Sequence, residues 1–259
     1  MQIDLSNRVA LVTGGDSGIG AACARALAEA GADVAIIYHS DEEGAQQTAR
    51  AIRAGGRNVE VIQGDVGREE DVERAFDTTV AALGAPTILV NSAGLNMSDT
   101  PVAEMDLAQW ERVLRTDLTG VFLAARRFIR QLDGQDTPAA IINISSIHES
   151  VMRAGGADYA AAKGGVRNLT QTLALEVAAR RITVNSIAPG MILTPMNQEA
   201  MDDEGKRQEA ESHIPARRAG QPEEIGRIAV FLAAAESGYI TGTTVTADGA
   251  LSLQLGQGA

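Results

Sequence analysis

Short apolar segments rich in β-branched residues recur along the chain and alternate with longer segments of helical composition. Each short segment is mostly apolar on both faces and is bounded by Gly, Pro, Asn or Asp, which is typical of strands buried on two sides. The predicted strands are 8–13, 33–38, 58–63, 87–92, 139–145, 182–187 and 242–247. The pattern therefore predicts a sheet that is covered on both faces.

The intervening segments carry helix signals. Segments 20–31, 41–56 and 69–84 all end in glycine, and the last two begin with acidic residues, which suit a helix N-terminus. Strands separated by helix-length segments form βαβ units with right-handed crossovers and parallel pairing. We therefore expect an α/β fold: a single Rossmann-like domain over 1–259, with a doubly wound parallel sheet and helices on both faces.

Composition narrows the classes of partner. The chain has 259 residues, of which 45% are hydrophobic, and a formal net charge of −12. An acidic surface argues against nucleic acid, because phosphate backbones are bound through basic surface. Asp4 and Arg8 place charges in the N-terminal segment, which is not expected of a secretory signal. No apolar run approaches the roughly 18 residues of a membrane span. We expect a cytoplasmic protein that binds neither nucleic acid nor membrane.

The cysteine and histidine content gives no metal motif. A single cysteine, Cys23, cannot form an intrachain disulfide, and its alanine-rich helical setting predicts a packed side chain in a reducing compartment. The three histidines, His39, His148 and His213, are far apart and lack the spacing of metal ligands. We expect no metal site.

The segment TGGDSGIG, residues 13–20, places four glycines between the first predicted strand and the first predicted helix. In doubly wound sheets, ligands bind beyond the carboxyl ends of the strands. Glycines there allow a tight turn and let the backbone approach a pyrophosphate, which the helix N-terminus attracts. A glycine turn alone is a weak signal, but this position favours nucleotide binding.

A second group of residues suits proton chemistry. Tyr159 and Lys163 are four residues apart in a predicted helix, so both side chains project to the same side. A lysine charge at about 4 Å contributes roughly 4 kcal/mol, close to the three pKa units that a phenol must lose to act near neutral pH. The segment IINISS ends a predicted strand 13 residues before the tyrosine, which places a serine at the same sheet edge.

Together these motifs resemble the short-chain dehydrogenase/reductase family over about residues 6–250. TGGDSGIG is similar to the family's TGxxxGxG turn, and NSAG, the serine, Tyr-x-x-x-Lys and a Pro-Gly pair follow in the family's order. The resemblance implies that Tyr159 is the general acid/base, that Ser146 polarises the substrate oxygen, and that Lys163 binds the nicotinamide ribose. The family's spacing selects Ser146 over its neighbour Ser145.

The resemblance also implies a set of cofactor-binding residues around a nicotinamide dinucleotide. They are Gly14, Asp16, Ser17, Gly18, Ile19, Gly20, Tyr38, His39, Ser40, Asp65, Val66, Asn91, Ala93, Gly94, Tyr159, Lys163, Pro189, Gly190, Ile192 and Thr194.

One position departs from the family. The segment RTDLTGVF has Asp117 where the family usually has an asparagine that supports a proton relay with the lysine. We count Asp117 with the catalytic residues and expect the relay to survive with an altered pH dependence.

Cofactor preference depends on the end of the second strand. An acidic residue there favours NAD, because it binds the ribose hydroxyls and repels a 2′-phosphate. Here Tyr38, His39 and Ser40 occupy this place, and Asp41 follows, while the glycine turn lacks a basic residue. We expect NADP to be favoured and NAD to be tolerated, with His39 as a candidate phosphate contact.

The substrate prediction rests on the segment SSIHES, residues 145–150. It is similar to the same stretch of bacterial glucose 1-dehydrogenases, which implies a sugar or polyol substrate held by Ser146, Tyr159, His148 and Glu149. The alternative within the family is a 3-oxoacyl-[acyl-carrier-protein] reductase. Arg126, Arg127 and Arg130 would then form the docking patch, although a chain with net charge −12 repels an acidic carrier.

Three further expectations follow from the resemblance. Residues 193–215 would form a lid over the substrate, and a C-terminal strand at about 240–250 would pair subunits of a homotetramer, with Ala250 where relatives have glycine. Trp110 and Phe122 would pack in the helix pair that builds this tetramer.

A protein that only senses NAD(P) is a different class of function, but such proteins tend to lose the tyrosine or lysine, and both are present here.

Overall fold

The computed structural model describes residues 3–96 and 99–254. In this part of the chain, parallel strands form a seven-stranded sheet in the order β3-β2-β1-β4-β5-β6-β7. The strands are β1 (Val9–Thr13), β2 (Asp33–Tyr38), β3 (Val59–Gln63), β4 (Ile88–Asn91), β5 (Ala139–Ile144), β6 (Ile182–Pro189) and β7 (Thr244–Ala247). The predicted doubly wound parallel sheet is confirmed, and its order reverses between β1 and β4.

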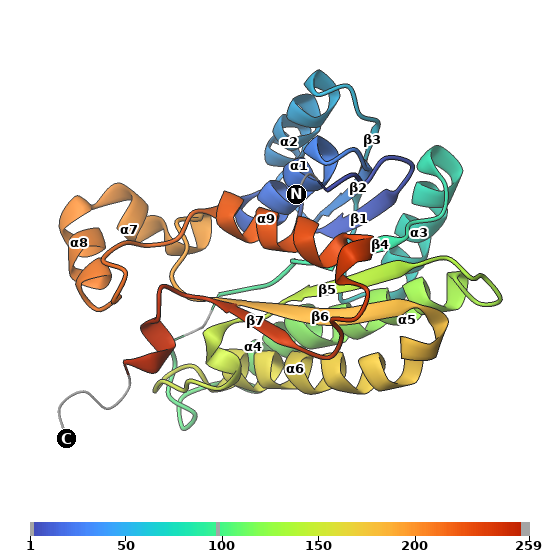
Figure 1. The fold of residues 1–259 in the computed structure, drawn as a ribbon. Helices are drawn as coiled ribbons and strands as arrows, with labels where there is room; N and C mark the ends of the chain where they lie inside the picture. The colour runs from blue at the N-terminus through green and yellow to red at the C-terminus, as the bar shows by residue number, and fades with distance from the viewer. Residues whose placement is uncertain (1–2, 97–98, 255–259) are drawn as a thin grey trace.

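Helices cover both faces of the sheet (Figure 1). The first face carries α1 (Gly18–Glu29), α2 (Glu42–Ala54) and α9 (Pro222–Ala233). The second carries α3 (Glu69–Leu83), α4 (Leu107–Leu114), α5 (Gly120–Gln131) and α6 (Ala157–Val177). Two short helices, α7 (Gln198–Asp202) and α8 (Glu204–Ser212), project from one end of the molecule (Figure 1).

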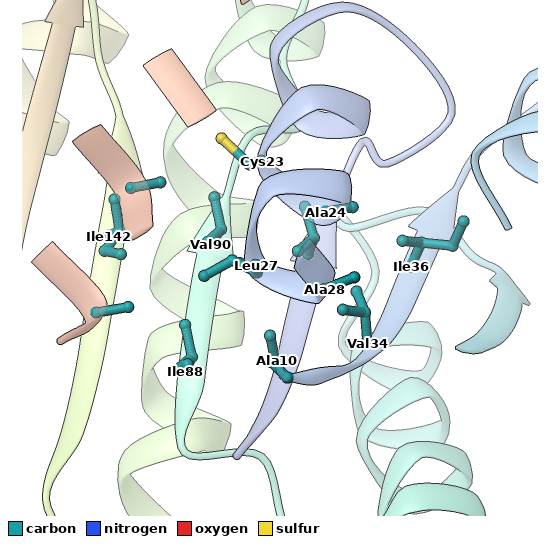
Figure 2. Packing of buried hydrophobic residues seen from close by; sticks show 14 of the residues in the cluster. Ala10, Cys23, Ala24, Leu27, Ala28, Val34, Ile36, Ile88, Val90 and Ile142 are labelled. Atoms are coloured by element: carbon teal, nitrogen blue, oxygen red, sulfur yellow. The ribbon is translucent and has the colours of Figure 1, made fainter. Parts of the chain in front are cut away.

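Two apolar cores follow from the pleat of the strands, since successive side chains point to opposite faces. On β1, Ala10 and Val12 pack toward α1 and α9, whereas Leu11 packs toward the second face. Figure 2 shows the first core, in which Leu27 of α1 lies among side chains of the central strands. This two-sided burial explains why the strands lack polar alternation.

Helix α1 packs closely against α9 because both present small residues. A Cβ added at Gly226 of α9 would lie 2.9 Å from the carbonyl oxygen of Ala22. Cys23 lies in this packed region, and burial raises the pKa of its thiol to about 12, so it remains an inert thiol. The sequence predicted this packing role.

Differences from the predicted elements are confined to their ends. The last strand spans only Thr244–Ala247, a short edge strand within the predicted 240–250. Residues 193–215 contain a 3₁₀ turn, η4 (Pro195–Asn197), followed by α7 and α8. No helix in the described ranges is long and apolar enough to cross a bilayer.

Candidate active site

A cavity of about 890 Å³ opens at the carboxyl ends of β1, β2, β4, β5 and β6. Nearly all the cofactor and catalytic residues predicted from sequence line it. Those lining residues are Gly14, Asp16, Ser17, Gly18, Ile19, Gly20, Tyr38, His39, Ser40, Asp65, Val66, Ala93, Gly94, Asp117, Ser146, Tyr159, Lys163, Pro189, Gly190, Ile192 and Thr194. The sheet topology thus brings together segments that are far apart in the sequence.

The glycine turn after β1 has the conformation that its sequence requires. Gly14 and Gly18 have φ angles of +66° and +50°, and a Cβ at Gly14 would lie 2.9 Å from Cα of Ala93. Ser17 is the N-cap residue of α1, but its hydroxyl donates to Asp16 Oδ2 at 3.4 Å and accepts no hydrogen bond from the first amides of the helix. These amides, together with the close approach of the Gly14 backbone to Ala93, suit the binding of a pyrophosphate group.

The ends of β1 and β4 are joined by Thr13, whose Oγ1 accepts hydrogen bonds from the amides of Ser92 (3.0 Å) and Ala93 (3.1 Å). Asn91, predicted as a cofactor contact, lies in the interior instead and donates through Nδ2 to Oδ1 of Asn143 at 2.8 Å. In the described part of the chain, Ser92 rather than Asn91 lines the cavity.

Two elements supply the three groups suited to proton chemistry. Ser146 follows β5 and caps the 3₁₀ turn η2 (Ile147–Glu149), and its Oγ accepts a hydrogen bond from the amide of His148 at 3.2 Å. Tyr159 and Lys163 lie on α6, and Nζ of Lys163 is 5.3 Å from the centroid of the Tyr159 ring. All three residues are at most 9% exposed.

The ammonium of Lys163 is paired with Asp117. Nζ lies 3.2 Å from Asp117 Oδ2 and donates to the carbonyl oxygen of Ile144 at 3.2 Å. Asp117 lies in a π-helical segment, η1 (Arg115–Thr119), between α4 and α5, and its Oδ1 accepts the amide of Leu95 at 2.8 Å. Such irregular helical turns often occur at functional sites.

Burial and charge oppose each other in this pair. Burial raises the pKa of Asp117, an effect that Lys163 counteracts and that the negative charge of Asp158 reinforces. For Lys163, burial lowers the pKa, but the charges of Asp117 and Tyr159 outweigh it and raise the pKa overall. Lys163 therefore keeps its proton at neutral pH.

Two predicted substrate contacts lie elsewhere. Neither His148 nor Glu149 is among the described residues that line the cavity. His148 Nδ1 lies 2.7 Å from the carbonyl oxygen of Val151, and its ring packs edge-on against Tyr159 at 6.2 Å. Glu149 binds Ser145 through Oε2 at 2.6 Å and lies near Arg167.

The residues at the end of β2 form another part of the cavity lining. His39 and Ser40 are exposed there, and Asp41 caps α2 by accepting the amide of Gly44 at 3.0 Å. Asp16 lies beside them, and burial, with the nearby charge of Asp41, raises its pKa.

The cavity also contains residues that the sequence did not single out. Arg112 and Arg115 reach it from α4 and η1, and Leu95 lines it from the loop after β4. Nothing in the local sequence marks these side chains, because their position depends on how the loops pack. Among the described residues, no group of three or more His, Cys, Asp or Glu side chains could hold a metal ion.

Comparison with known proteins agrees with this geometry. A family model described as enoyl-(acyl carrier protein) reductase matches residues 14–252. A 3β-hydroxysteroid dehydrogenase 1 of Eggerthella lenta is 42% identical over the whole of both chains. Glucose 1-dehydrogenase 2 of Bacillus subtilis is 34% identical over 98% of each chain.

Solved structures show the same fold. A gluconate 5-dehydrogenase of Burkholderia cenocepacia, in complex with NADP and tartrate, superposes with a TM-score of 0.89 at 36% identity, covering 97% of this chain and 98% of that one. The chain belongs to the short-chain dehydrogenase/reductase family and is an NAD(P)-dependent oxidoreductase acting on CH–OH groups.

Removal of Lys163 tests the buried ion pair. Lys163→Met leaves the carboxyl of Asp117 without a cation, so its pKa, already raised by burial, rises further. A raised acid pKa in the folded state costs stability as pH rises above the unfolded value of 3.8. We expect a loss of about 3–5 kcal/mol in unfolding free energy near pH 8 and a smaller loss near pH 5, measured by urea denaturation.

The double variant Lys163→Met/Asp117→Asn carries no ionisable carboxyl at this place and is the matched control. We expect its deficit relative to the wild type to vary less with pH than that of Lys163→Met. Equal deficits of Lys163→Met at both pH values would show that the Asp117 charge is not what Lys163 stabilises.

Proposed function

We propose that the protein transfers hydride between a nicotinamide dinucleotide and a carbonyl or secondary alcohol by a Ser-Tyr-Lys mechanism. The observation that carries the proposal is that Ser146, Tyr159 and Lys163 line the same cavity as the glycine turn. When bound there, the nicotinamide supplies the acceptor or donor of hydride. Every proton step falls to the protein.

In the direction of oxidation, the phenolate of Tyr159 would take the hydroxyl proton of the alcohol, and a nicotinamide held in the cavity would accept the hydride from the carbon that bears this hydroxyl. Ser146 has an acceptor lone pair occupied by the amide of His148, and its own O–H proton is free to donate to the substrate oxygen. This donor stabilises the negative charge that develops on the oxygen during transfer.

Lys163 holds a positive charge 5.3 Å from the centroid of the Tyr159 ring, where it stabilises negative charge that develops on the phenol oxygen during proton transfer. Its position is fixed by Asp117 and by the carbonyl of Ile144. The carboxylate of Asp117 offsets part of the lysine charge, which an asparagine would not do. We therefore assign to Asp117 a share in setting the pH range of the reaction.

We propose that NADP is the favoured cofactor and that NAD is tolerated. The residues at the end of β2 that face the cavity, Tyr38, His39 and Ser40, carry no carboxylate to repel a 2′-phosphate. Asp41 is engaged as the cap of α2. Asp16 is the nearby acid, and its pKa is raised by burial and by the charge of Asp41.

A sugar or polyol is our first candidate substrate. It is supported by the similarity of SSIHES to glucose dehydrogenases and by the glucose and gluconate dehydrogenases among the relatives. Asn96 and Asn197 add polar groups to the cavity lining, and Nδ2 of each also donates to a backbone carbonyl, that of Met196 at 3.1 Å and that of Ile192 at 2.8 Å.

A hydroxysteroid is the second candidate. The relative named for this activity is 42% identical over its whole length. Leu95, Ile192 and Met196 form an apolar part of the cavity lining that suits an alicyclic ring.

The alternative of a carrier-protein reductase has less support. Arg126 is paired with Glu69, and Arg127 lies 2.7 Å from Glu73 and 2.9 Å from Asp77. These guanidinium charges are compensated on the surface, so they offer a weaker docking patch for an acidic carrier.

We further propose a cytoplasmic homotetramer in which 193–215 act as a lid. The lid is supported by Met196 and Asn197 in the cavity lining and by a hydrogen bond of 3.1 Å from Asn96 Nδ2 to the Met196 carbonyl. Subunit contacts are supported by the exposed apolar side chains of Phe122 on α5 and Leu175 on α6, and by the edge position of β7. Trp110 is partly buried on α4.

The mechanism predicts the effect of removing the phenol oxygen. Tyr159→Phe should lower kcat by about 10²–10⁴-fold, the range of general acid–base catalysis, while NADPH affinity stays within a few-fold. The assay is hydride transfer with aldoses, polyols, a hydroxysteroid and a β-ketoacyl thioester, each with NAD and NADP. Equal rates in wild type and variant would refute the mechanism.

The cofactor proposal predicts the effect of a charge at the end of β2. His39→Asp should lower kcat/KM for NADPH by at least about tenfold, roughly 1.4 kcal/mol, because a carboxylate repels the 2′-phosphate. The value for NADH should change less. His39→Asn is the neutral control, and an equal change for both cofactors in His39→Asp would argue against a phosphate at this place.

A further inference from the structure

The carboxylate of Glu149 is committed to protein partners. Its side chain is 6% exposed, and Oε2 accepts a hydrogen bond of 2.6 Å from Oγ of Ser145. Oε1 lies 3.8 Å from Nε of Arg167. Both oxygens are therefore directed at the protein, which leaves little of this carboxylate for a substrate hydroxyl.

These contacts join the two elements that carry the proton-transfer groups. Ser145 continues β5 and immediately precedes Ser146, whereas Arg167 lies one turn beyond Lys163 on α6. Glu149 ends the 3₁₀ turn η2 between them. The turn also approaches α6 closely, since a Cβ at Gly164 would lie 3.8 Å from the Glu149 carbonyl oxygen.

The backbone before Ser146 is held from several sides. The amide of Ser145 donates to the carbonyl of Ile187 on β6 at 2.8 Å, and Lys163 donates to the carbonyl of Ile144. The bond between Ser145 and Glu149 adds a side-chain restraint at the same place. A charge-assisted O–H···O⁻ bond of this length is among the stronger hydrogen bonds in proteins.

The two contacts of Glu149 differ in strength. Arg167 has a side chain that is 47% exposed, so water screens its attraction to Glu149. Ser145 is 3% exposed, and its hydroxyl would lose a buried partner without Glu149. The serine bond is therefore the stronger restraint.

We propose that Glu149 is a positioning residue, which acts through Ser145 to fix Ser146 relative to Tyr159. Catalytic groups must be held within about 0.5 Å of the productive geometry, and Ser146 and Tyr159 come from different elements. The proposal rests on the proposed hydride transfer. It replaces the sugar contact predicted for Glu149 from sequence with a role on the protein side of the site.

The test uses Glu149→Ala, Ser145→Ala and the double variant, assayed with the best substrate of the panel. We expect each single variant to lower kcat about tenfold, while KM for the substrate and the dissociation constant of NADPH stay within about threefold. The double variant should be no slower than the slower single variant, because both changes remove the same bond. Glu149→Gln, which keeps an acceptor oxygen, should recover part of the loss.

Glu176→Gln, at an exposed position of α6, is the matched control and should leave kcat unchanged. A raised substrate KM with unchanged kcat in Glu149→Ala would identify a substrate contact and overturn the proposal. Multiplicative losses in the double variant, or a lowered Tm with unchanged kcat, would also overturn it.

The outcome is separable from that of the proposed function. If wild type and Tyr159→Phe turn over every substrate of the panel at the same rate, the proposed function fails and the positioning role fails with it. If turnover depends on Tyr159 while Glu149→Ala and Ser145→Ala match the wild type, the positioning role alone is refuted.

Discussion

The ammonium of Lys163 lies in the interior at 5% exposure, and a charge there must be compensated by nearby groups. The compensation comes from Asp117, across the space between α6 and the π-helical segment that joins α4 to α5. The same carboxylate binds the amide of Leu95 just beyond β4. One ion pair thus ties the helix carrying Tyr159 to the loop that forms the middle of the cavity.

Close packing around this pair has consequences for the neighbouring backbone. A Cβ at Gly94 would lie 2.8 Å from Asp117 Oδ2 and 3.5 Å from Lys163 Nζ, so glycine leaves the space that the pair occupies. A second polar network lies beneath it. Asn91, Asn143, Thr170 and Ser186 form a hydrogen-bonded chain that links β4, β5, α6 and β6. These buried networks hold the elements of the cavity in register.

The sequence predicts the sheet, its helices and most of the cavity lining because these depend on local patterns and ordered motifs. Burial on two sides makes the strands apolar, and a parallel sheet brings their carboxyl ends to one edge. Asn91 and Glu149 illustrate what sequence leaves open. Each is a polar residue within a motif, and only the packed structure reveals that Asn91 binds Asn143 and that Glu149 binds Ser145. The lysine partner Asp117 was marked only by its departure from the family's asparagine.

The pH dependence of activity tests most directly whether Asp117 controls the charge of Lys163. In Asp117→Asn, Lys163 loses the carboxylate that raises its pKa, so its ammonium loses its proton at a lower pH than in the wild type. We predict that the alkaline limb of the kcat/KM profile for alcohol oxidation, where Lys163 loses its proton, shifts to lower pH in this variant. Superimposable profiles of variant and wild type would contradict the account.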